Sequence, residues 1–403
     1  MTYPQVDLGS VVDLQAGIGF PTRLQGKTSG KFPFAKVGDI SRNGRTGKPI
    51  LSTVDNYIDQ TDVESLRAKI IPEGSILFAK IGEAIKQNHR VISHRSLLID
   101  NNAMAAIPSE KIDNLYLYYF LKQVDFYRLA PATTVPALRK SDLEKIKIPL
   151  PPLAEQRRIA AILDQADELR QKRQQAIEKL DQLLQATFID MFGDPVSNPK
   201  GWEVKKLSEL STKIHSGNTP KGGSENYVDQ GIIFLRSQNV WKNKVILDDV
   251  AYIDAETHSK MMKSSVKHED LLMTKTGRIN TENSSLGRAA IYLGEDDSAN
   301  INGHVYLIRI KDGFNKYFIL RILTLPDYYE YIRSVCVGGI DKRQLNKEHI
   351  ENFPIIQPPM ELQNKFSNIV QVIESQKPKL LEQLDLAENL FKTLQQKAFN
   401  GTL

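Results

Sequence analysis

The chain contains the same motif twice, at positions 207 residues apart. Residues 151–159 read PPLAEQRRI and residues 358–366 read PPMELQNKF, and apolar positions on both sides of the motif keep the same spacing. A repeat of about half the chain is too long for a solenoid, whose units have roughly 20–50 residues. We therefore expect a duplicated domain followed by a duplicated long helix, which together can present two similar surfaces to one partner.

Composition restricts the class of protein. A chain of 403 residues, 41% of them hydrophobic, suggests two or three globular domains rather than a disordered protein. It has no run of about 18 apolar residues, and its N-terminus lacks a basic region followed by an apolar stretch, so neither a membrane span nor a signal peptide is expected. The single cysteine, Cys336, is expected to be a buried thiol in a reducing compartment, and the chain is expected to be cytoplasmic.

Turn residues divide the chain into four segments. Prolines precede both stretches of helical spacing, and the linker GDPVSNPKGW follows the first one. Residues 1–150 and 194–357 contain short β-type runs, which predict two α+β domains. Residues 151–193 and 358–403 are predicted to be helical.

The two helical segments have an apolar period near 3.5 over about four heptads, which indicates a coiled coil. Each helix of about 39 residues would be roughly 58 Å long, and we expect the two to pair because neither can bury its apolar stripe alone. Pro378 is expected to kink or break the second helix. The predicted contact positions of the first helix are Ile159, Ile162, Ala166, Leu169, Ala176, Leu180, Leu183 and Thr187, with Arg173 out of pattern; those of the second are Phe366, Ile369, Ile373, Gln376, Leu380, Gln383, Ala387, Phe391 and Leu394.

The net charge of +5 is located outside the helices. The segments Glu155–Phe192 and Glu361–Phe399 together contain 12 acids (7 + 5) and 11 bases (6 + 5). The positive excess therefore belongs to the two domains, as expected for a nucleic-acid binder with neutral structural helices.

Clusters of basic and amide side chains occur at corresponding places in both domains. Arg, Lys, Asn and Gln can read guanine and adenine edges, while Lys, Ser and Thr hold phosphates. For any single residue the alternative is an ordinary solvated loop, but the recurrence in both domains favours DNA binding for the set. The predicted DNA-binding residues are Lys36, Arg42, Asn43, Arg45, Lys48, Lys80, Lys86, Asn88, Arg90, Arg236, Ser237, Gln238, Asn239, Lys242, Lys275, Thr276, Arg278 and Asn280.

Motifs for catalysis, metal binding and nucleotide binding are missing from the sequence. There is no GxxxxGK[ST] loop, and the seven histidines show no paired ligand spacing. The Pro-Pro pairs resemble the catalytic tetrapeptide of amino-methyltransferases only superficially, because their flanking residues do not supply its acceptor and stacking ring. We therefore expect no catalytic residue, no metal and no cofactor.

The order of these features resembles the specificity (S) subunit of a type I restriction–modification system. The resemblance covers the whole chain and is carried by PPLAEQ at 151–156, PPMELQ at 358–363, and GWEVKKLSEL at 201–210, which resembles the start of a second target-recognition domain. Each of the two Pro-Pro motifs begins a long helix, which ends near Phe192-Gly193 or Phe399-Asn400-Gly401. Two departures are Pro378 and the Met360-Glu361-Leu362 copy of the Leu-x-Glu element, and they affect only the expected helix geometry.

The resemblance implies an α+β fold with two α/β target-recognition domains separated by two long helices that pair as an antiparallel, pseudo-twofold coiled coil. Each domain would recognise one half of a split site in double-stranded DNA, while the helices would dock two methylation subunits and set the spacer. Motor–nuclease subunits would join that core, and no membrane is involved. The alternative is a duplicated coiled-coil scaffold that binds proteins, which explains the helices but not the basic loops. The implied helix-frame and partner-binding residues are Pro151, Pro152, Gln156, Pro358, Pro359 and Gln363.

Overall fold

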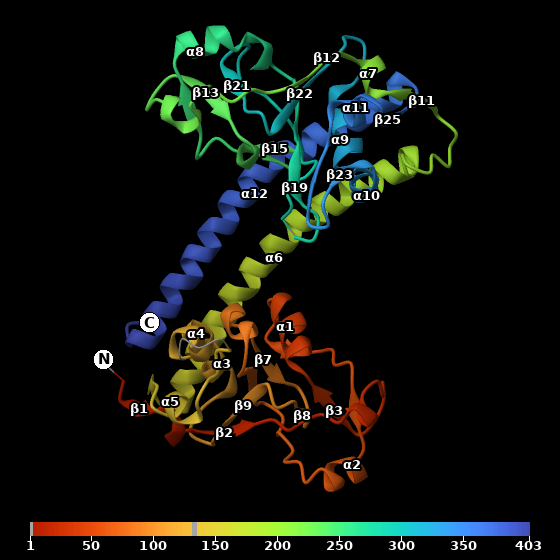
Figure 1. The fold of residues 1–403 in the computed structure, drawn as a ribbon. Coiled ribbons are helices and arrows are strands. Elements are labelled where there is room, and N and C mark those ends of the chain that lie inside the picture. The colour runs from red at the N-terminus through yellow and green to blue at the C-terminus, as the bar shows by residue number, and fades with distance from the viewer. Residues whose placement is uncertain (1–2, 131–134, 282) are drawn as a thin grey trace. The chain divides into compact units, whose positions relative to one another are not determined.

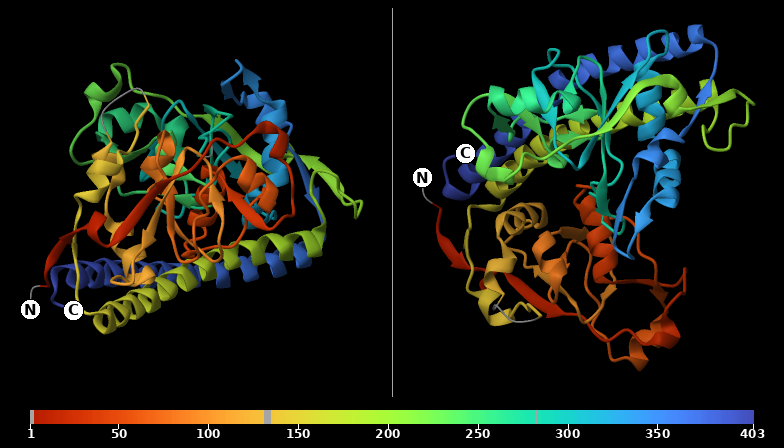
Figure 2. Two further views of the ribbon diagram at one scale, coloured as in Figure 1. Left: turned by 90° about the horizontal axis from the view of Figure 1, so that it is seen from below. Right: turned by 45° about the horizontal axis from the view of Figure 1, so that its top comes forward.

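The computed structural model describes residues 3–130, 135–281 and 283–403, which form two compact units. One unit contains Met1–Ala176 and Lys379–Leu403, and the other contains Ile177–Pro378. Each unit therefore combines one globular head with part of each long helix, α6 (Leu153–Phe192) and α12 (Met360–Asn400), which Figures 1 and 2 show from three directions. We call residues 3–150 the first head and residues 194–357 the second head.

The first head is a mixed β-structure covered by short helices. Its main sheet has the order β2-β9-β6-β7-β4, a smaller sheet has the order β5-β3-β8, and β1 pairs with β10. The strands are β1 (Gln5–Asp7), β2 (Val12–Ala16), β3 (Phe32–Ala35), β4 (Ile50–Leu51), β5 (Tyr57–Ile58), β6 (Ile76–Ala79), β7 (Arg90–Ser93), β8 (Leu98–Ile99), β9 (Ala103–Pro108) and β10 (Lys147–Pro149). The helices are α1 (Val37–Arg45), α2 (Gln60–Ser65), α3 (Asn114–Gln123), α4 (Phe126–Leu129) and α5 (Lys140–Glu144).

The second head contains two four-stranded sheets, β12-β22-β18-β20 and β16-β13-β21-β17, with a separate three-stranded sheet β19-β24-β23 and the pairs β11–β25 and β14–β15. The strands are β11 (Glu203–Lys206), β12 (Ser211–Ser216), β13 (Ile232–Leu235), β14 (Val240–Trp241), β15 (Lys244–Val245), β16 (Ala251–Ile253), β17 (Ser265–Val266), β18 (Leu271–Thr274), β19 (Thr276–Arg278), β20 (Ala289–Ile291), β21 (Ala299–Ile301), β22 (Val305–Ile310), β23 (Val337–Gly338), β24 (Lys342–Gln344) and β25 (Pro354–Gln357). The helices are α7 (Leu207–Leu210), α8 (Ala255–Lys260), α9 (Lys316–Thr324), α10 (Pro326–Val335) and α11 (Lys347–Glu351).

The two heads share one strand topology. The order β2-β9-β6-β7 corresponds to β12-β22-β18-β20, the order β5-β3-β8 corresponds to β16-β13-β21, and the pair β1–β10 corresponds to β11–β25. The parallel pair β3–β8 also has its parallel counterpart in β13–β21. The duplication predicted from the helix motifs therefore extends through the main sheets of both heads, while the sheet β19-β24-β23 and the pair β14–β15 belong to the second head.

The long helices pair in antiparallel orientation within each unit. In the first unit the side chains of Arg173 in α6 and Gln383 in α12 are hydrogen-bonded. In the second unit Lys377 Nζ lies 2.6 Å from Asp181 Oδ1, and the rings of Phe188 and Phe366 lie 5.4 Å apart. Because the residue number falls along α12 as it rises along α6, the pairing is antiparallel, as the resemblance implied.

The buried stripe of α6 differs from the predicted one. Leu169 and Leu183, which were expected at the contact between the helices, are 41% and 52% exposed, whereas Leu163, Leu184 and Phe188 are buried. In α12 the prediction holds better, since Phe366, Ile373, Ala387 and Phe391 are buried, but Gln376 is exposed.

The heads explain this difference, because the ends of both helices contribute to the head cores. Ile159, Leu163 and Ala166 of α6 join Phe391 and Phe399 of α12 in the apolar cluster of the first head. In the second head the corresponding cluster takes its helical members Phe188, Phe192 and Phe366 from the same two helices. The apolar stripe therefore packs into a head at each end of α6, and only in the middle of the helix does it have α12 alone to pack against.

Pro378 does not break the second helix, so of the two predicted effects the break is wrong and the kink stays a prediction. Helix α12 is continuous from Met360 to Asn400 with Pro378 inside it. Next to it, Lys377 forms ion pairs at 2.6 Å with both Glu374 and Asp181, which hold this part of α12 against α6.

Candidate nucleic-acid interface

A basic residue follows the equivalent strands β3 and β13 at the same structural position. In the first head the backbone N–H of Lys36 donates to Asp39 Oδ2 at 2.8 Å, and in the second head that of Arg236 donates to Asn239 Oδ1 at 2.9 Å. In both heads a side-chain oxygen, from a carboxylate or an amide, thus fixes the first turn after the strand, as in a helix cap. Burial raises the pKa of Asp39, a cost that the neutral Asn239 avoids.

A second basic residue follows β6 and β18. The backbone N–H of Lys80 donates to the Asn102 carbonyl at 2.7 Å, and that of Lys275 donates to the His304 carbonyl at 2.8 Å. The turns that contain Asn102 and His304 also bond to the ends of β3 and β13, just before Lys36 and Arg236. There the Asp100 N–H donates to the Ala35 carbonyl, and the Asn302 N–H donates to the Leu235 carbonyl. Each head thus brings its two basic positions to one turn, although they are about 40 residues apart in sequence. We call these pairs, Lys36 with Lys80 and Arg236 with Lys275, the paired basic positions.

Two of the predicted DNA-reading amides are instead internal supports. Asn43 is 2% exposed, and its side chain donates to the carbonyls of Asp39 and Thr53 while accepting from the N–H of Ser52. Asn239 is 1% exposed and donates to the carbonyls of Ile246 and Asp249. These amides hold loops in place, and their groups are not presented to a groove.

The cations around α1 differ in their freedom. Arg42 makes a bidentate ion pair with Asp55 at 2.7 and 2.9 Å and also contacts Asp39. Asp55 raises the pKa of Arg42, so this guanidinium is already engaged. Arg45 and Lys48 are exposed, and no carboxylate among the described residues pairs with them. Among the predicted cations of this segment, Arg42 is thus held by its acids, whereas Arg45 and Lys48 are not.

Arg90 is a buried core residue, contrary to the prediction that it binds DNA. It is 4% exposed, its guanidinium lies 3.7 Å from the centre of the Phe126 ring, and it donates to Asn88 Oδ1 at 2.8 Å. Burial lowers the pKa of Arg90 to about 9. Asn88 is engaged by this hydrogen bond from Arg90. Lys86 is half exposed and forms an ion pair with Glu83 at 2.7 Å.

The cluster around Arg236 contains an acid that its local sequence does not reveal. Asp249, ten residues beyond Asn239, folds back so that it accepts from Arg236 at 3.3 Å and from Gln238 at 3.2 Å. Ser237 is half-buried, whereas Lys242 is exposed with its Nζ 5.0 Å from the centre of the Tyr329 ring. Arg236 and Gln238 therefore share one carboxylate that orients both side chains.

Strand β19 displays the last predicted group. Arg278 is exposed and lies 3.4 Å from Asp341, Asn280 is exposed beyond the strand, and Thr276 faces Gln344 in the ladder with β24. The pairing adds cations that sequence reasoning missed, because Lys342 and Arg343 of β24 oppose Arg278 and Gly277. Their distance of more than 60 residues from β19 in sequence left no local signal.

The residues repeated at the two helix entries serve the frame. Gln156 is fully buried and binds three backbone groups: it accepts from Asp113 N–H at 2.8 Å and donates to Lys111 O and Pro151 O. Gln363, 3% exposed, donates to Pro358 O at 2.8 Å in the corresponding bond. Both glutamines are therefore inaccessible to a partner subunit, whereas Pro152 and Pro359 are exposed and Pro151 and Pro358 are buried.

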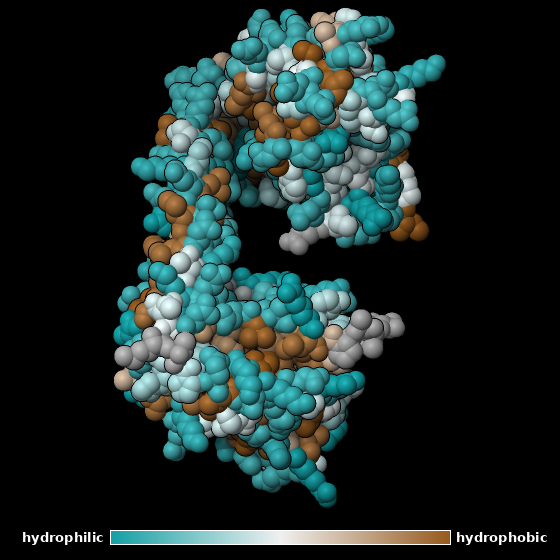
Figure 3. Space-filling view, turned by 90° about the vertical axis from the view of Figure 1, so that its left-hand side faces the viewer, coloured by the Kyte–Doolittle hydropathy of each residue, from teal (hydrophilic) through white to brown (hydrophobic). Residues whose placement is uncertain are grey.

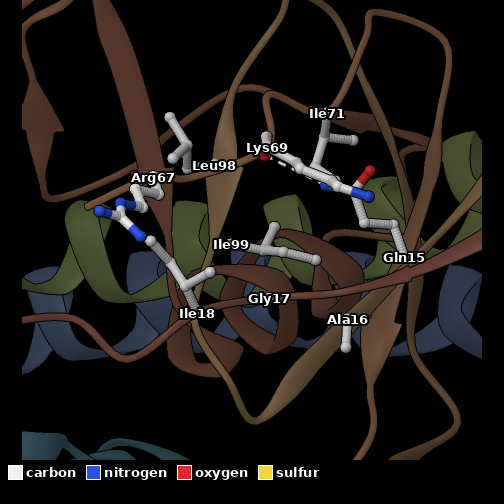
Figure 4. A pocket seen from close by; sticks show the side chains of 9 residues that line it. All are labelled: Gln15, Ala16, Gly17, Ile18, Arg67, Lys69, Ile71, Leu98 and Ile99. Atoms are coloured by element: carbon white, nitrogen blue, oxygen red, sulfur yellow. Dashed lines mark hydrogen bonds between the residues drawn. The ribbon is translucent and has the colours of Figure 1, made fainter. Parts of the chain in front are cut away.

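A small cleft of about 240 Å³ in the first head has no chemistry that indicates catalysis. Figure 4 shows Arg67 and Lys69 at its rim over an apolar floor that includes Ile18, Leu98 and Ile99. Gln15 Nε2 donates to the Lys69 carbonyl across it at 3.0 Å. Within the described ranges no group of three or more His, Cys, Asp and Glu residues could hold a metal ion. Among the helices of these ranges, none has the length and apolar character needed to cross a bilayer.

Comparison with known proteins agrees with this duplicated architecture. The family described as the type I restriction modification DNA specificity domain matches residues 2–179 and again residues 199–385. The chain belongs to this family. Its two matches coincide with the two heads and the adjoining parts of the helices, so the repeated unit of the family is the repeated unit of the structure.

Individual members of the family resemble the chain over most of its length. The MjaIX specificity subunit of Methanocaldococcus jannaschii is 26% identical over 393 residues, which cover 91% of this chain and 84% of the relative. The StySPI specificity subunit of Salmonella potsdam is 22% identical over 73% of this chain and 67% of the relative. The S subunit from M. genitalium has a TM-score of 0.55 at 18% identity, with 99% of this chain and 96% of that one covered. It shares the fold, as does a solved structure from the assembly of a type I R-M system, with a TM-score of 0.50 at 18% identity over 100% of this chain and 98% of that one.

Proposed function

We propose that this chain is the DNA specificity subunit of a type I restriction–modification complex, with each head reading one half of a bipartite site. The observation that supports this most strongly is the pair of basic positions. Both heads place them at the same turn on the same topology, and one of the two side chains differs: Lys36 in the first head corresponds to Arg236 in the second, whereas Lys80 and Lys275 are both lysines. Equal scaffolds with different side chains suit two heads that dock alike but read different sequences.

We infer a contact surface for each head from the exposure of its predicted residues. The first head would use Lys36, Arg45, Lys48, Lys80 and Lys86, with Arg42 oriented by its acids. In the second head the surface comprises Arg236, Ser237, Gln238, Lys242, Lys275, Thr276, Arg278 and Asn280. Lysines near phosphates would supply affinity and its salt dependence, with a slope of about −0.9 for each phosphate neutralised. Arginine, glutamine and asparagine side chains would supply base discrimination.

The domain boundaries follow from the same proposal. Residues 1–150 and 194–357 would be the two target-recognition domains, and residues 151–193 and 358–403 the helical spacer that sets the distance between half-sites. We infer that the chain catalyses no reaction itself and that methylation and cleavage belong to other subunits. The solved structure that resembles this fold comes from work on type I R-M complex assembly, which supports a multi-subunit context.

The helices also carry matched apolar side chains for partners. Leu183 in α6 and Leu390 in α12 are separated by the repeat spacing of 207, and they are 52% and 48% exposed. Figure 3 shows separate apolar side chains (brown) among hydrophilic ones (teal) along the helical part of the chain. Two equivalent exposed leucines suit two copies of one methylation subunit, and motor–nuclease subunits would join through that core.

Reciprocal substitutions at the paired basic positions test the two-head proposal. In the complex of this chain with its methylation subunits, Lys275→Ala or Arg236→Ala should weaken or relax one half-site, and Lys80→Ala should affect the other. Genome-wide mapping of methylated bases reads both halves at once. Loss of discrimination in both halves from a single substitution would contradict the proposal.

Two further measurements separate the spacer role and the scaffold alternative. Insertion of one heptad into each helix should change the spacer length while leaving both half-site sequences unchanged; an unchanged spacer would count against the ruler role. A salt-dependent mobility shift of DNA with the methylation subunit present is expected of a specificity subunit. A protein-binding scaffold would give no such shift.

A further inference from the structure

The second head contains a small antiparallel ribbon that is separate from its two main sheets. Strand β24 (Lys342–Gln344) lies between β19 and β23 (Val337–Gly338), and the hairpin closes with a bond of 3.1 Å from Gly339 N–H to the Lys342 carbonyl. Gly338 has a φ of +135°, and a Cβ there would lie 2.7 Å from that same carbonyl. The turn therefore requires glycine and presents Ile340 and Asp341 at its tip.

The tip carries an apolar side chain that the fold does not use. Ile340 is 90% exposed, the highest value among the large apolar residues of the described ranges, and Val337 at the base of the hairpin is 42% exposed. Turn tips usually take Gly, Asn, Asp or Ser, since these residues suit the backbone and water. An isoleucine at this place gains stabilisation only when another surface covers it.

The charges around the tip indicate what that surface is. Arg278, Lys342 and Arg343 lie on the two paired strands, and Asp341 is the acid beside them, 3.4 Å from Arg278. The ribbon thus combines a net positive rim with an apolar end. Strands of small β-sheets can read DNA in either groove. In the major groove apolar side chains contact thymine methyl groups, and isoleucine is also a known wedge between base steps. The positive rim is complementary to the phosphates of DNA, which favours DNA as the surface that covers the tip.

We propose that the hairpin Val337–Gln344 enters a groove of the half-site read by the second head, with Ile340 against the bases and with Arg278 and Lys342 on the flanking phosphates. The inference rests on the proposed function and names a reading element beyond the paired basic positions. The corresponding segment of the first head includes residues 131–134, which lie outside the described residues, so the proposal concerns the second head.

Substitution in the assembled methylation complex tests the energetic part of the proposal. Ile340→Ser should weaken binding of a DNA duplex with the recognition sequence by roughly tenfold or more, as expected from loss of a covered isoleucine side chain, without changing the salt slope. Lys342→Ala should reduce that slope by about 1. Leu293→Ala, an exposed apolar residue of the same unit outside the ribbon, is the matched control and should leave affinity and slope unchanged. Equal affinity for Ile340→Ser and the unsubstituted chain would overturn the inference.

A photo-crosslinking side chain at position 340 identifies the partner directly. Crosslinks to the DNA strand at the second half-site would support the proposal, whereas crosslinks to a methylation subunit, or none to DNA, would overturn it. Lys275→Ala distinguishes failure of the ribbon inference from failure of the proposed function. If it weakens DNA binding while every change at Ile340 is silent, only the ribbon inference fails. If the unsubstituted complex shows no sequence-dependent DNA binding, the proposed function itself fails.

Discussion

The last turns of the chain belong to the first head, and Phe399→Ala tests that assignment. Phe399 is 7% exposed, and its ring lies 5.3 Å from Tyr116 and 5.4 Å from Phe120, both in α3. Truncating a buried phenylalanine costs about 3–5 kcal/mol. The loss of two aromatic pairs, each worth about 0.5–1.5 kcal/mol, places the expected cost near the upper end of that range. Since a domain has only about 5–15 kcal/mol of stability, the first head should lose a large part of its own.

Hydrogen–deuterium exchange of the full chain in its complex measures this effect by region. Phe399→Ala should speed exchange in α3 and β9 of the first head and leave α9 and β22 of the second head unchanged. Phe192→Ala, in the aromatic cluster of the second head with Phe318 and Phe366, should give the opposite pattern. Leu386→Ala in α12 is the control, because this leucine is 62% exposed and should cost less than about 0.5 kcal/mol. Faster exchange in the second head after Phe399→Ala would refute the assignment of the C-terminal turns.

Two other substitutions test the supports of the heads. Burial raises the pKa of Asp39, so the stability linked to this carboxyl is fully present below its ordinary pKa and is lost as the pH rises through the folded pKa. Asp39→Asn, which copies Asn239, should remove this fall from a plot of the urea unfolding midpoint against pH. An unchanged plot would argue against a destabilising buried carboxylate at this position. Gln156→Ala should lower the free energy of unfolding by about 1–3 kcal/mol because it leaves buried backbone groups unpaired. Gln363→Ala should cost less because Gln363 makes one hydrogen bond of this kind. Equal losses in chemical denaturation would contradict the idea that the cost follows the number of backbone groups left unpaired.

The repeat allowed much of the architecture to be predicted. The motifs at 151–156 and 358–363 indicated two long helices and two similar domains, and the structure has both, with helices at Leu153–Phe192 and Met360–Asn400. The phase of the α6 stripe could not be predicted, since its apolar residues are shared between a partner helix and two head cores. Periodicity alone does not show which surface a leucine such as Leu169 or Leu183 faces.

The site was harder to predict because one residue type serves two purposes. Asn43 and Asn239 have the amides that read adenine, but the same amides also satisfy backbone groups in tight loops, and here they do. Arg90 reads as a phosphate contact in sequence, yet it packs on Phe126 inside the head. Only the tertiary fold could add Asp249 beside Arg236, or bring Lys342 beside Arg278.

The place where the two halves of the frame differ shows how the heads can diverge on a common support. Asp167 and Arg170 form an ion pair at 2.7 Å in α6, and the repeat spacing of 207 places Glu374 and Lys377 at the same positions of α12, where they pair at 2.6 Å. At the next position Gln171 donates to the carbonyl of Gly47, so the loop after α1 is attached to the helix. Its counterpart is Pro378, whose side chain has no donor, and the second head cannot be held in this way. The loop after α1, moved from the first head to the second, would therefore lose its anchor unless Pro378 were also replaced by glutamine. The frame thus restricts which loops each head can carry.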